Sequence, residues 1–128
     1  MKLLKEIKYG IQRIKRGYSD RDTWDFNSYL NSIIPKAVRK IKDDGYGCPS
    51  DLYDSKNKDN FHKWKDVLED IAQGFESAEA LDNMRYFKHT KTDKGYLQEV
   101  DNKKLKQLTD KFDKGIKLFT KYYMGLWD

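Results

Sequence analysis

The sequence predicts an all-α protein: a small single-domain bundle of about four helices over residues 1–128, with the second helix kinked at Pro35. Apolar residues recur every three or four positions along most of the chain, which is the period of an amphipathic helix. Clusters of Gly, Pro, Asp, Asn and Ser separate these periodic segments, and no segment combines strand alternation with a hairpin turn. Helices joined by loops of this kind form bundles, and 128 residues is the usual size of one domain.

The first helix is expected to end at Gly17, a residue that commonly stops helices. Its apolar stripe is narrow and consists of Leu4, Ile7, Ile11 and Ile14. Its other faces carry a single acid, Glu6, beside six bases: Lys2, Lys5, Lys8, Arg13, Lys15 and Arg16.

The second helix is expected to follow Ser19. On a helical wheel one broad face holds Phe26, Leu30, Ile33, Ile34, Ala37, Val38 and Ile41. Pro35 falls on the opposite, polar face, and the apolar phase continues through it. We therefore predict one kinked helix, because Pro35 removes the hydrogen bond to the Asn31 carbonyl and bends the helix there.

A loop follows, in which Gly45 and Gly47 end the second helix and Pro49 prevents its continuation. Asp59 or Asn60 is expected to cap a third helix that ends near Asn83. Its predicted stripe is Phe61, Trp64, Leu68, Ile71, Ala72, Phe75 and Ala78.

Residues 83–100 are predicted to form a long loop or to contain a short helix. In either case the aromatic residues of this segment are expected to pack against the rest of the domain. A last helix is predicted from about Asp101. Its apolar face consists of Leu105, Leu108, Phe112, Ile116, Phe119, Tyr123 and Leu126, and lysines occupy the other face.

Composition narrows the classes of partner. The chain has 26 Lys and Arg against 21 Asp and Glu, a net charge of +5 that suits an anionic partner. It is not the dense excess of a nucleic-acid-binding arm. Cys48 is a lone cysteine, which indicates a reducing compartment. The N-terminal residues are too charged for a signal peptide and no run has membrane-spanning length, so a cytosolic protein without membrane contact is expected.

The stretch from Gly17 to Phe26 gathers charged and aromatic side chains in one turn region. Ser19 followed three positions later by Asp22 approximates a capping box, in which a side-chain oxygen accepts from a free backbone N–H. A magnesium site at Asp20 and Asp22 is the alternative, but Asp-x-Asp alone is a weak signal. Capping explains these residues without any chemistry.

Three further side chains near the second helix are candidates for a binding surface. Trp24 lies off the apolar face, so it either folds back over the preceding turn or offers a stacking surface with Arg21 beside it. Asn27 and Asn31, one turn apart, either bond backbone near Pro35 or form the polar lining of a pocket.

Catalysis has little support in the sequence. His62 and His89 belong to no recognisable motif, and the chain has no Gly-x-Ser-x-Gly, Cys–His or His-Glu-x-x-His arrangement. The Gly-Tyr-Gly-Cys-Pro segment lacks the lysine of a phosphate-binding loop. Acids are interleaved with the lysines of the first and last helices, which makes nucleic-acid binding a less favoured alternative. We expect a protein without catalytic residues, metal or cofactor.

The chain resembles a family of short, helical bacteriophage and prophage proteins without an assigned activity. The resemblance rests on a Gly-aromatic-Ser-Asp-x-Asp-x-Trp run at residues 17–24, a helix followed by a Gly-x-Gly-x-Pro turn at residues 45–49, and a C-terminal Leu-Trp-Asp at residues 126–128. It spans most of the chain except residues 83–100. Position 46 departs from the family pattern, which often has His where this chain has Tyr46.

The resemblance implies a phage accessory protein that acts by binding in the host cytoplasm and counters host defences. Our leading hypothesis is sequestration of an anionic, nucleotide-like defence signal, with rings stacking on the base and cations contacting phosphate. The expected ligand-binding residues are Arg21, Trp24, Asn27, Asn31, Arg39 and Tyr46. Lys42 would assist as a cation. The alternative is a protein–protein module that inhibits a host complex or belongs to the phage particle, and the low apolar content favours a homo-oligomer.

Overall fold

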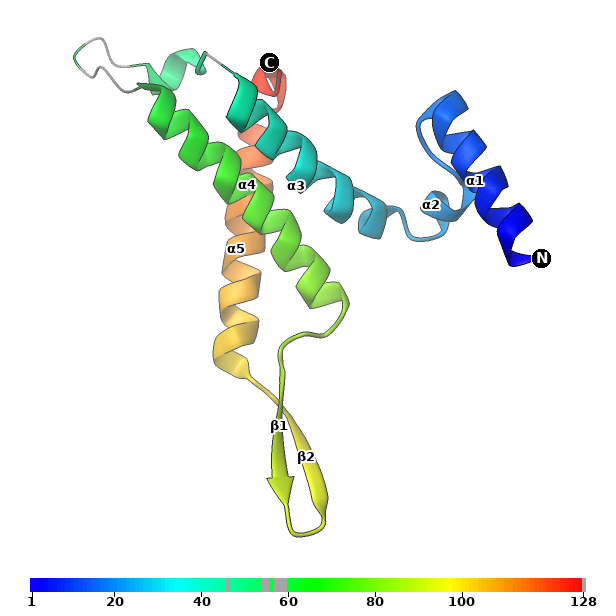
Figure 1. Cartoon of the computed structure of the whole chain (residues 1–128). Helices are drawn as coiled ribbons and strands as arrows, with labels where there is room; N and C mark the ends of the chain where they lie inside the picture. The colour runs from blue at the N-terminus through cyan, green and yellow to red at the C-terminus, as the bar shows by residue number, and fades with distance from the viewer. Residues whose placement is uncertain (46, 54–55, 57–59, 128) are drawn as a thin grey trace. The chain divides into compact units, whose positions relative to one another are not determined.

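The computed structural model in Figure 1 describes residues 1–45, 47–53, 56 and 60–127. Its described residues are mostly helical, as predicted, with four helices of 15 to 23 residues, one short helix and a two-stranded sheet. The chain divides into two compact units, Met1–Leu30 and Asn31–Asp128, called here the N-terminal and C-terminal units. The single domain expected from the sequence stays a prediction.

In the N-terminal unit, helix α1 spans Lys2–Arg16 and ends as predicted. Gly17 adopts a left-handed conformation with φ of 86°, and its N–H donates to the Arg13 carbonyl at 2.9 Å. Helix α2, Asp20–Trp24, packs on the polar side of α1. Gln12 donates to Asp20 at 2.8 Å, and Arg13 donates to Asp22 at 2.9 Å through its Nε.

The capping box predicted at Ser19 and Asp22 is present. The Asp22 N–H donates to the Ser19 hydroxyl oxygen at 3.2 Å, and the Ser19 N–H donates to the Asp22 carboxylate at 2.8 Å. The single helix expected from Ser19 onward is wrong, because the helix breaks at Asp25, whose φ of −145° is not helical. The carboxylate of Asp25 accepts from the Ser28 hydroxyl, and its carbonyl accepts from the Ser28 N–H. Short acidic side chains compete with the helical backbone in this way.

Helix α3 spans Phe26–Asp44 and contains Pro35. The placement of Pro35 on a polar face is wrong, because Asn31, Pro35 and Val38 are the buried positions, while Ile33 of the predicted apolar face is exposed. Arg39 and Lys42 explain the difference, because their ion pairs with glutamates of the next helix, α4 (Asn60–Asp82), hold this side of α3 against it. The predicted kink stays a prediction.

The core of the C-terminal unit lies between α4, Asn60–Asp82, and α5, Asn102–Lys121, with α3 packed against it (Figure 1). The stripe predicted for α4 is largely confirmed, since Trp64, Leu68, Ile71, Ala72 and Phe75 are all buried. The cap predicted at Asp59 or Asn60 stays a prediction, because Asp59 lies outside the described residues and the side chain of Asn60 is not described. Asp101 caps α5 by accepting from the Lys104 N–H at 3.1 Å.

The contact between α4 and α5 depends on two glycines. A Cβ built on Gly74 would lie 2.6 Å from the Gly115 Cα, and the reverse distance is also 2.6 Å. Both glycines are buried, so the two backbones touch where the helices meet. No larger residue fits either position without a shift of one helix.

Residues 87–100 form a β-hairpin, where the sequence predicted a loop or short helix. Strand β1, Phe87–Thr92, pairs antiparallel with β2, Gly95–Val100, through a two-residue connection, and Gly95 has φ of 125°. The hairpin extends away from the α4 and α5 helices in Figure 1, and nearly all of it is exposed. The connection is Asp93-Lys94 rather than the Asn-Gly or Asp-Gly typical of such turns, which explains why the pattern was missed.

The C-terminal end of α5 also departs from prediction. The helix ends at Lys121, and a single 3₁₀ turn, η2, spans Tyr123–Gly125. Consequently Tyr122 enters the core, where its ring meets Trp64 edge-on at 5.5 Å, while Tyr123 of the predicted apolar face is exposed.

Candidate binding cleft

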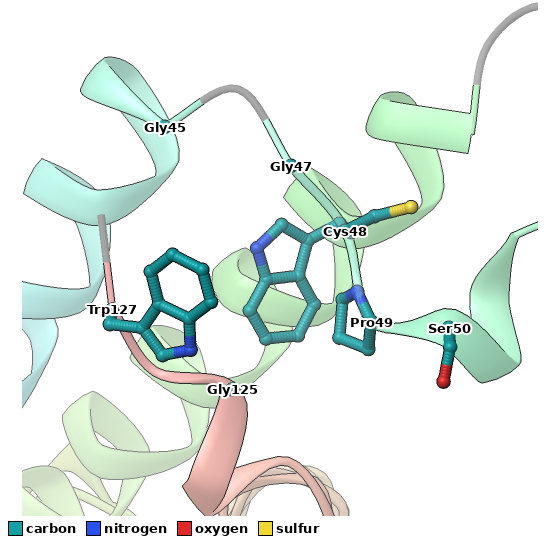
Figure 2. Close-up of a pocket in the computed structure, with 8 residues that line it drawn as sticks. Gly45, Gly47, Cys48, Pro49, Ser50, Gly125 and Trp127 are labelled. Carbon is teal, nitrogen blue, oxygen red and sulfur yellow. The ribbon is translucent and has the colours of Figure 1, made fainter.

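A cleft of about 280 Å³ lies where two segments distant in sequence meet over helix α4. One wall is the loop that follows α3 and the other is the C-terminal turn, and Figure 2 shows Trp127 opposite Pro49 and Ser50. The lining residues are Gly45, Gly47, Cys48, Pro49, Ser50, Trp64, Gly125 and Trp127. The Gly-x-Gly-x-Pro turn and the tryptophan of the C-terminal motif, which the resemblance singled out separately, therefore belong to one site.

Local constraints fix the loop wall of this cleft. The Gly45 N–H donates to the Ile41 carbonyl at 2.9 Å, and a Cβ at Gly45 would lie 2.8 Å from the same oxygen. The short 3₁₀ helix η1, Ser50–Leu52, follows Pro49 and is tied to the end of α5. The Tyr122 hydroxyl donates to the Asp51 carboxylate at 2.8 Å. Burial, together with this hydrogen bond, raises the pKa of Tyr122 above its usual value.

The cleft has an apolar, aromatic character. Trp64 is buried at its base, whereas the Trp127 side chain is 73% exposed. No charged side chain lines the cleft within the described residues, and the half-buried Cys48 thiol is its single ionisable group there. Such a lining can hold a flat or apolar group by contact and stacking, but it offers no paired acid and base.

None of the expected binding residues that the structure describes lines this cleft. Tyr46 lies outside the described residues, although its neighbours Gly45 and Gly47 are part of the lining. The other five fall into two groups. Arg21, Trp24 and Asn27 belong to the N-terminal unit, and Asn31 and Arg39 belong to the C-terminal unit.

Arg21 and Trp24 meet at a common ring, that of Tyr9. The guanidinium of Arg21 lies 4.6 Å from the centre of the Tyr9 ring, and Trp24 approaches the same ring edge-on at 6.1 Å. Arg21 also donates to Glu6 at 2.6 Å, and this hydrogen bond raises the pKa of Arg21. Trp24 is 72% exposed and Asn27 is exposed, so ligand binding by these residues stays a prediction.

Arg39 is engaged by helix α4. It donates to Glu69 at 3.0 Å and to Glu76 at 2.6 Å, and Lys42 donates to Glu69 at 2.9 Å. The hydrogen bond from Arg39 and, to a smaller extent, that from Lys42 lower the pKa of Glu69 to about 2. The cations expected to contact a phosphate are thus already paired with carboxylates.

A second hollow, of about 420 Å³, lies beside these ion pairs. Its lining consists of Asn31, Ser32, Pro35, Lys36, Arg39, Glu76 and Glu79. Asn31 is 8% exposed and forms part of the wall of this hollow. Its predicted hydrogen bond to backbone near Pro35 stays a prediction.

The acids at Gly17–Phe26 are held by side chains rather than poised for a metal. Asp20 accepts from Gln12 and Arg16, and Asp22 accepts from Arg13. Among the described residues no group of three His, Cys, Asp or Glu side chains is arranged to hold a metal ion.

Sequence reasoning missed Trp64, Gly125 and Trp127 as cleft residues. Trp64 belongs to the apolar stripe predicted for α4 and is buried as predicted, and Trp127 is part of the C-terminal Leu-Trp-Asp motif. Nothing in the spacing of residues 45–50 and 125–127 indicates that they meet.

No family model matches this chain, and no curated protein or solved structure is significantly similar to it. None of the helices among the described residues is both long and apolar enough to span a membrane.

Proposed function

We propose that this chain is a non-catalytic binding protein whose cleft takes up an apolar side chain of a partner protein. The observation that carries the proposal is the cleft lined by Trp64 and Trp127, where none of the described lining residues has a charged side chain. Exposed aromatic and methionine side chains are enriched at protein interfaces, and tryptophan dominates their energetics. The C-terminal turn beside the cleft exposes Tyr123, Met124 and Trp127.

The biological setting of this proposal comes from the resemblance to phage and prophage proteins. In that setting the chain is an accessory protein of the infected host's cytoplasm, and its partner is a host defence protein or a component of the phage particle. The low apolar content of the chain favours a homo-oligomer, so a second copy of the chain is one of the partners to test.

Replacement of Trp127 by Ala tests the cleft directly. The side chain is mostly exposed, so the variant should fold, yet one wall of the cleft is removed. We expect wild-type protein to retain a stoichiometric protein partner from infected cells and Trp127→Ala to lose it, a loss of about 2 kcal/mol or more. Capture followed by native mass spectrometry gives both the stoichiometry and the subunit count.

Tyr96→Ala is the matched control, because Tyr96 is equally exposed but lies in the hairpin. It should retain the partner. Equal capture by wild type and Trp127→Ala would place the interface elsewhere and refute the proposal.

Sequestration of a nucleotide is the second candidate, favoured by the two indole rings in the cleft, on which a base could stack. It is less well supported because Arg21, Arg39 and Lys42 are all paired with glutamates. A nucleotide mass retained by the purified protein in native mass spectrometry, and lost in Trp127→Ala, would favour this candidate over a protein partner.

A further inference from the structure

Helix α1 uses its polar side to hold the N-terminal unit together and leaves its apolar side outward. The contacts to α2 come from Gln12, Arg13 and Arg16, and the Tyr9 ring lies on this same side. The apolar stripe, by contrast, is exposed by 46% to 86% at Leu4, Ile7, Ile11 and Ile14. An amphipathic helix normally buries its apolar stripe, so this arrangement leaves a face for another molecule.

The spacing of the stripe indicates what kind of surface fits it. Leu4, Ile7, Ile11 and Ile14 are separated by three, four and three residues, which is the a and d spacing of two heptads. The stripe is a narrow seam, and β-branched Ile has few side-chain conformations to lose on packing. A narrow seam of this kind suits a facing helix better than the wide apolar face that lies in a lipid interface.

The charged residues around the seam indicate the sign of the charge that a partner would carry. Lys8 and Lys15 border one side of the seam, both are exposed, and neither forms a salt bridge with any described residue. Residues 2–16 contain six bases and one acid, so α1 carries 6 − 1 = +5, the whole formal net charge of the chain. Part of this charge is neutralised by α2, since residues 1–30 contain seven bases and four acids, 7 − 4 = +3. Two N-terminal units side by side would still bring like charges together, which disfavours self-association through this face.

We propose that the outward face of α1 binds an acidic amphipathic helix of a partner protein. Its apolar residues would pack into the seam of Leu4, Ile7, Ile11 and Ile14, and its carboxylates would pair with Lys8 and Lys15. This inference concerns a surface separate from the cleft and does not depend on the function proposed for it.

Two synthetic helical peptides provide the probe. They share one Leu and Ile seam in heptad spacing and carry either Glu or Lys at the flanking positions. We expect the full-length protein to bind the Glu peptide at least about tenfold more tightly than the Lys peptide in low salt, with the difference shrinking as salt rises. Fluorescence anisotropy of the labelled peptides measures both affinities.

Charge reversal at the border of the seam makes the test specific. The double variant Lys8→Glu with Lys15→Glu should prefer the Lys peptide instead. Lys91→Glu with Lys94→Glu makes the same change in net charge within the hairpin and should keep the wild-type preference. Ile7→Gln with Ile11→Gln replaces two apolar residues of the seam by a good helix former, so this variant should lose both peptides. Trp127→Ala should bind the Glu peptide normally.

Four results would overturn this inference. Equal binding of the two peptides, or none, would remove the acidic helix as the partner. Stronger binding to phosphatidylglycerol vesicles than to the Glu peptide would assign the face to a membrane. A dimer that Ile7→Gln with Ile11→Gln dissociates would assign it to a second copy, and a lowered unfolding midpoint in that variant would show that the chain itself covers the seam.

Discussion

Asp22 links helices α1 and α2 in the N-terminal unit. Its buried carboxylate accepts from the Ser19 N–H at 2.8 Å and from the Arg13 Nε at 2.9 Å. The Arg13 bond, followed by those from Ser19, holds the pKa of Asp22 far below its ordinary value of 3.8. The sequence predicted the capping box, because it depends on neighbours three residues apart. It did not predict Arg13 as a partner nine residues away.

Replacing Asp22 by Asn should weaken the N-terminal unit by about 1 to 3 kcal/mol, because a charged acceptor of buried hydrogen bonds is lost. Hydrogen exchange of the α1 and α2 amides measures this loss. A lowered folded-state pKa means that the stabilisation is present above pH 3.8 and is lost as the pH falls below that value. Wild type should therefore lose protection below about pH 4, and the variant should lack that step.

Asp43→Asn is the control for this prediction, since Asp43 is exposed and has no salt bridge to any described residue. It should leave the exchange of α1 and α2 unchanged. An Asp22→Asn variant with wild-type protection would contradict the role of the carboxylate.

Arg39 shows the limit of inference from single charged residues. The sequence predicted that Arg39 would contact a phosphate group, and nothing in the local pattern indicated another partner. Its two partners, Glu69 and Glu76, lie thirty or more positions away on α4. Only the packing of α3 on α4 brings these three side chains together.

At the level of whole elements, the α4–α5 pair is determined by shape as well as by apolar stripes. The stripes of both helices were readable from the sequence, and α4 buries the residues predicted for it. Gly74 and Gly115 carry no such signal, since a glycine in a helix ordinarily suggests a weak point. Their contact lets the two helices approach more closely than larger residues would allow.

Gly74→Ala should destabilise the protein by about 1 to 3 kcal/mol, because its Cβ would lie 2.6 Å from the Gly115 Cα and 3.0 Å from the Lys111 carbonyl oxygen. Gly10→Ala is the matched control. Gly10 is also helical but has no atom within 4 Å of a built Cβ, so alanine there should stabilise by up to about 1 kcal/mol. Urea unfolding of both variants measures the two changes, and a neutral or stabilising Gly74→Ala would contradict the close approach.

The hairpin also escapes prediction from the sequence, but for a different reason from that of the two glycines. Its two strands are exposed on both faces, so they lack the alternation of apolar and polar residues by which half-buried strands are recognised. The pairing of Phe87 with Val100 through Thr92 with Gly95 is a property of the backbone and the turn. A two-stranded hairpin of this size gains little stability from its local sequence alone.

Across the whole molecule, the two units are stabilised by different interactions. The buried residues of the N-terminal unit are Ser19 and Asp22, and its contacts are mainly hydrogen bonds and ion pairs. The C-terminal unit contains the apolar core, with Leu68, Ile71 and Ala72 fully buried. Apolar burial is the larger source of stability, so the two units should differ in how readily they open.

Native-state hydrogen exchange should therefore rank the helices. We expect the central amides of α4 and α5 to exchange only on global unfolding, and those of α1 to exchange at least about a hundredfold faster. Added Glu-flanked peptide should slow exchange in α1 alone. Equal protection of α1 and α4 in the free protein would contradict the assignment of the apolar core to the C-terminal unit.

The sequence by itself determined the helical class, the end of α1 at Gly17, most of the buried stripe of α4, the start of α5 near Asp101 and the Ser19–Asp22 box. Each of these depends on residues within a few helical turns. The tertiary structure decided which side of α3 is buried, where the glycines meet and which charges pair. It also brought residues 45 and 47–50 together with Gly125 and Trp127 in a common cleft. These outcomes depend on contacts between residues distant in sequence, which local periodicity and composition do not encode.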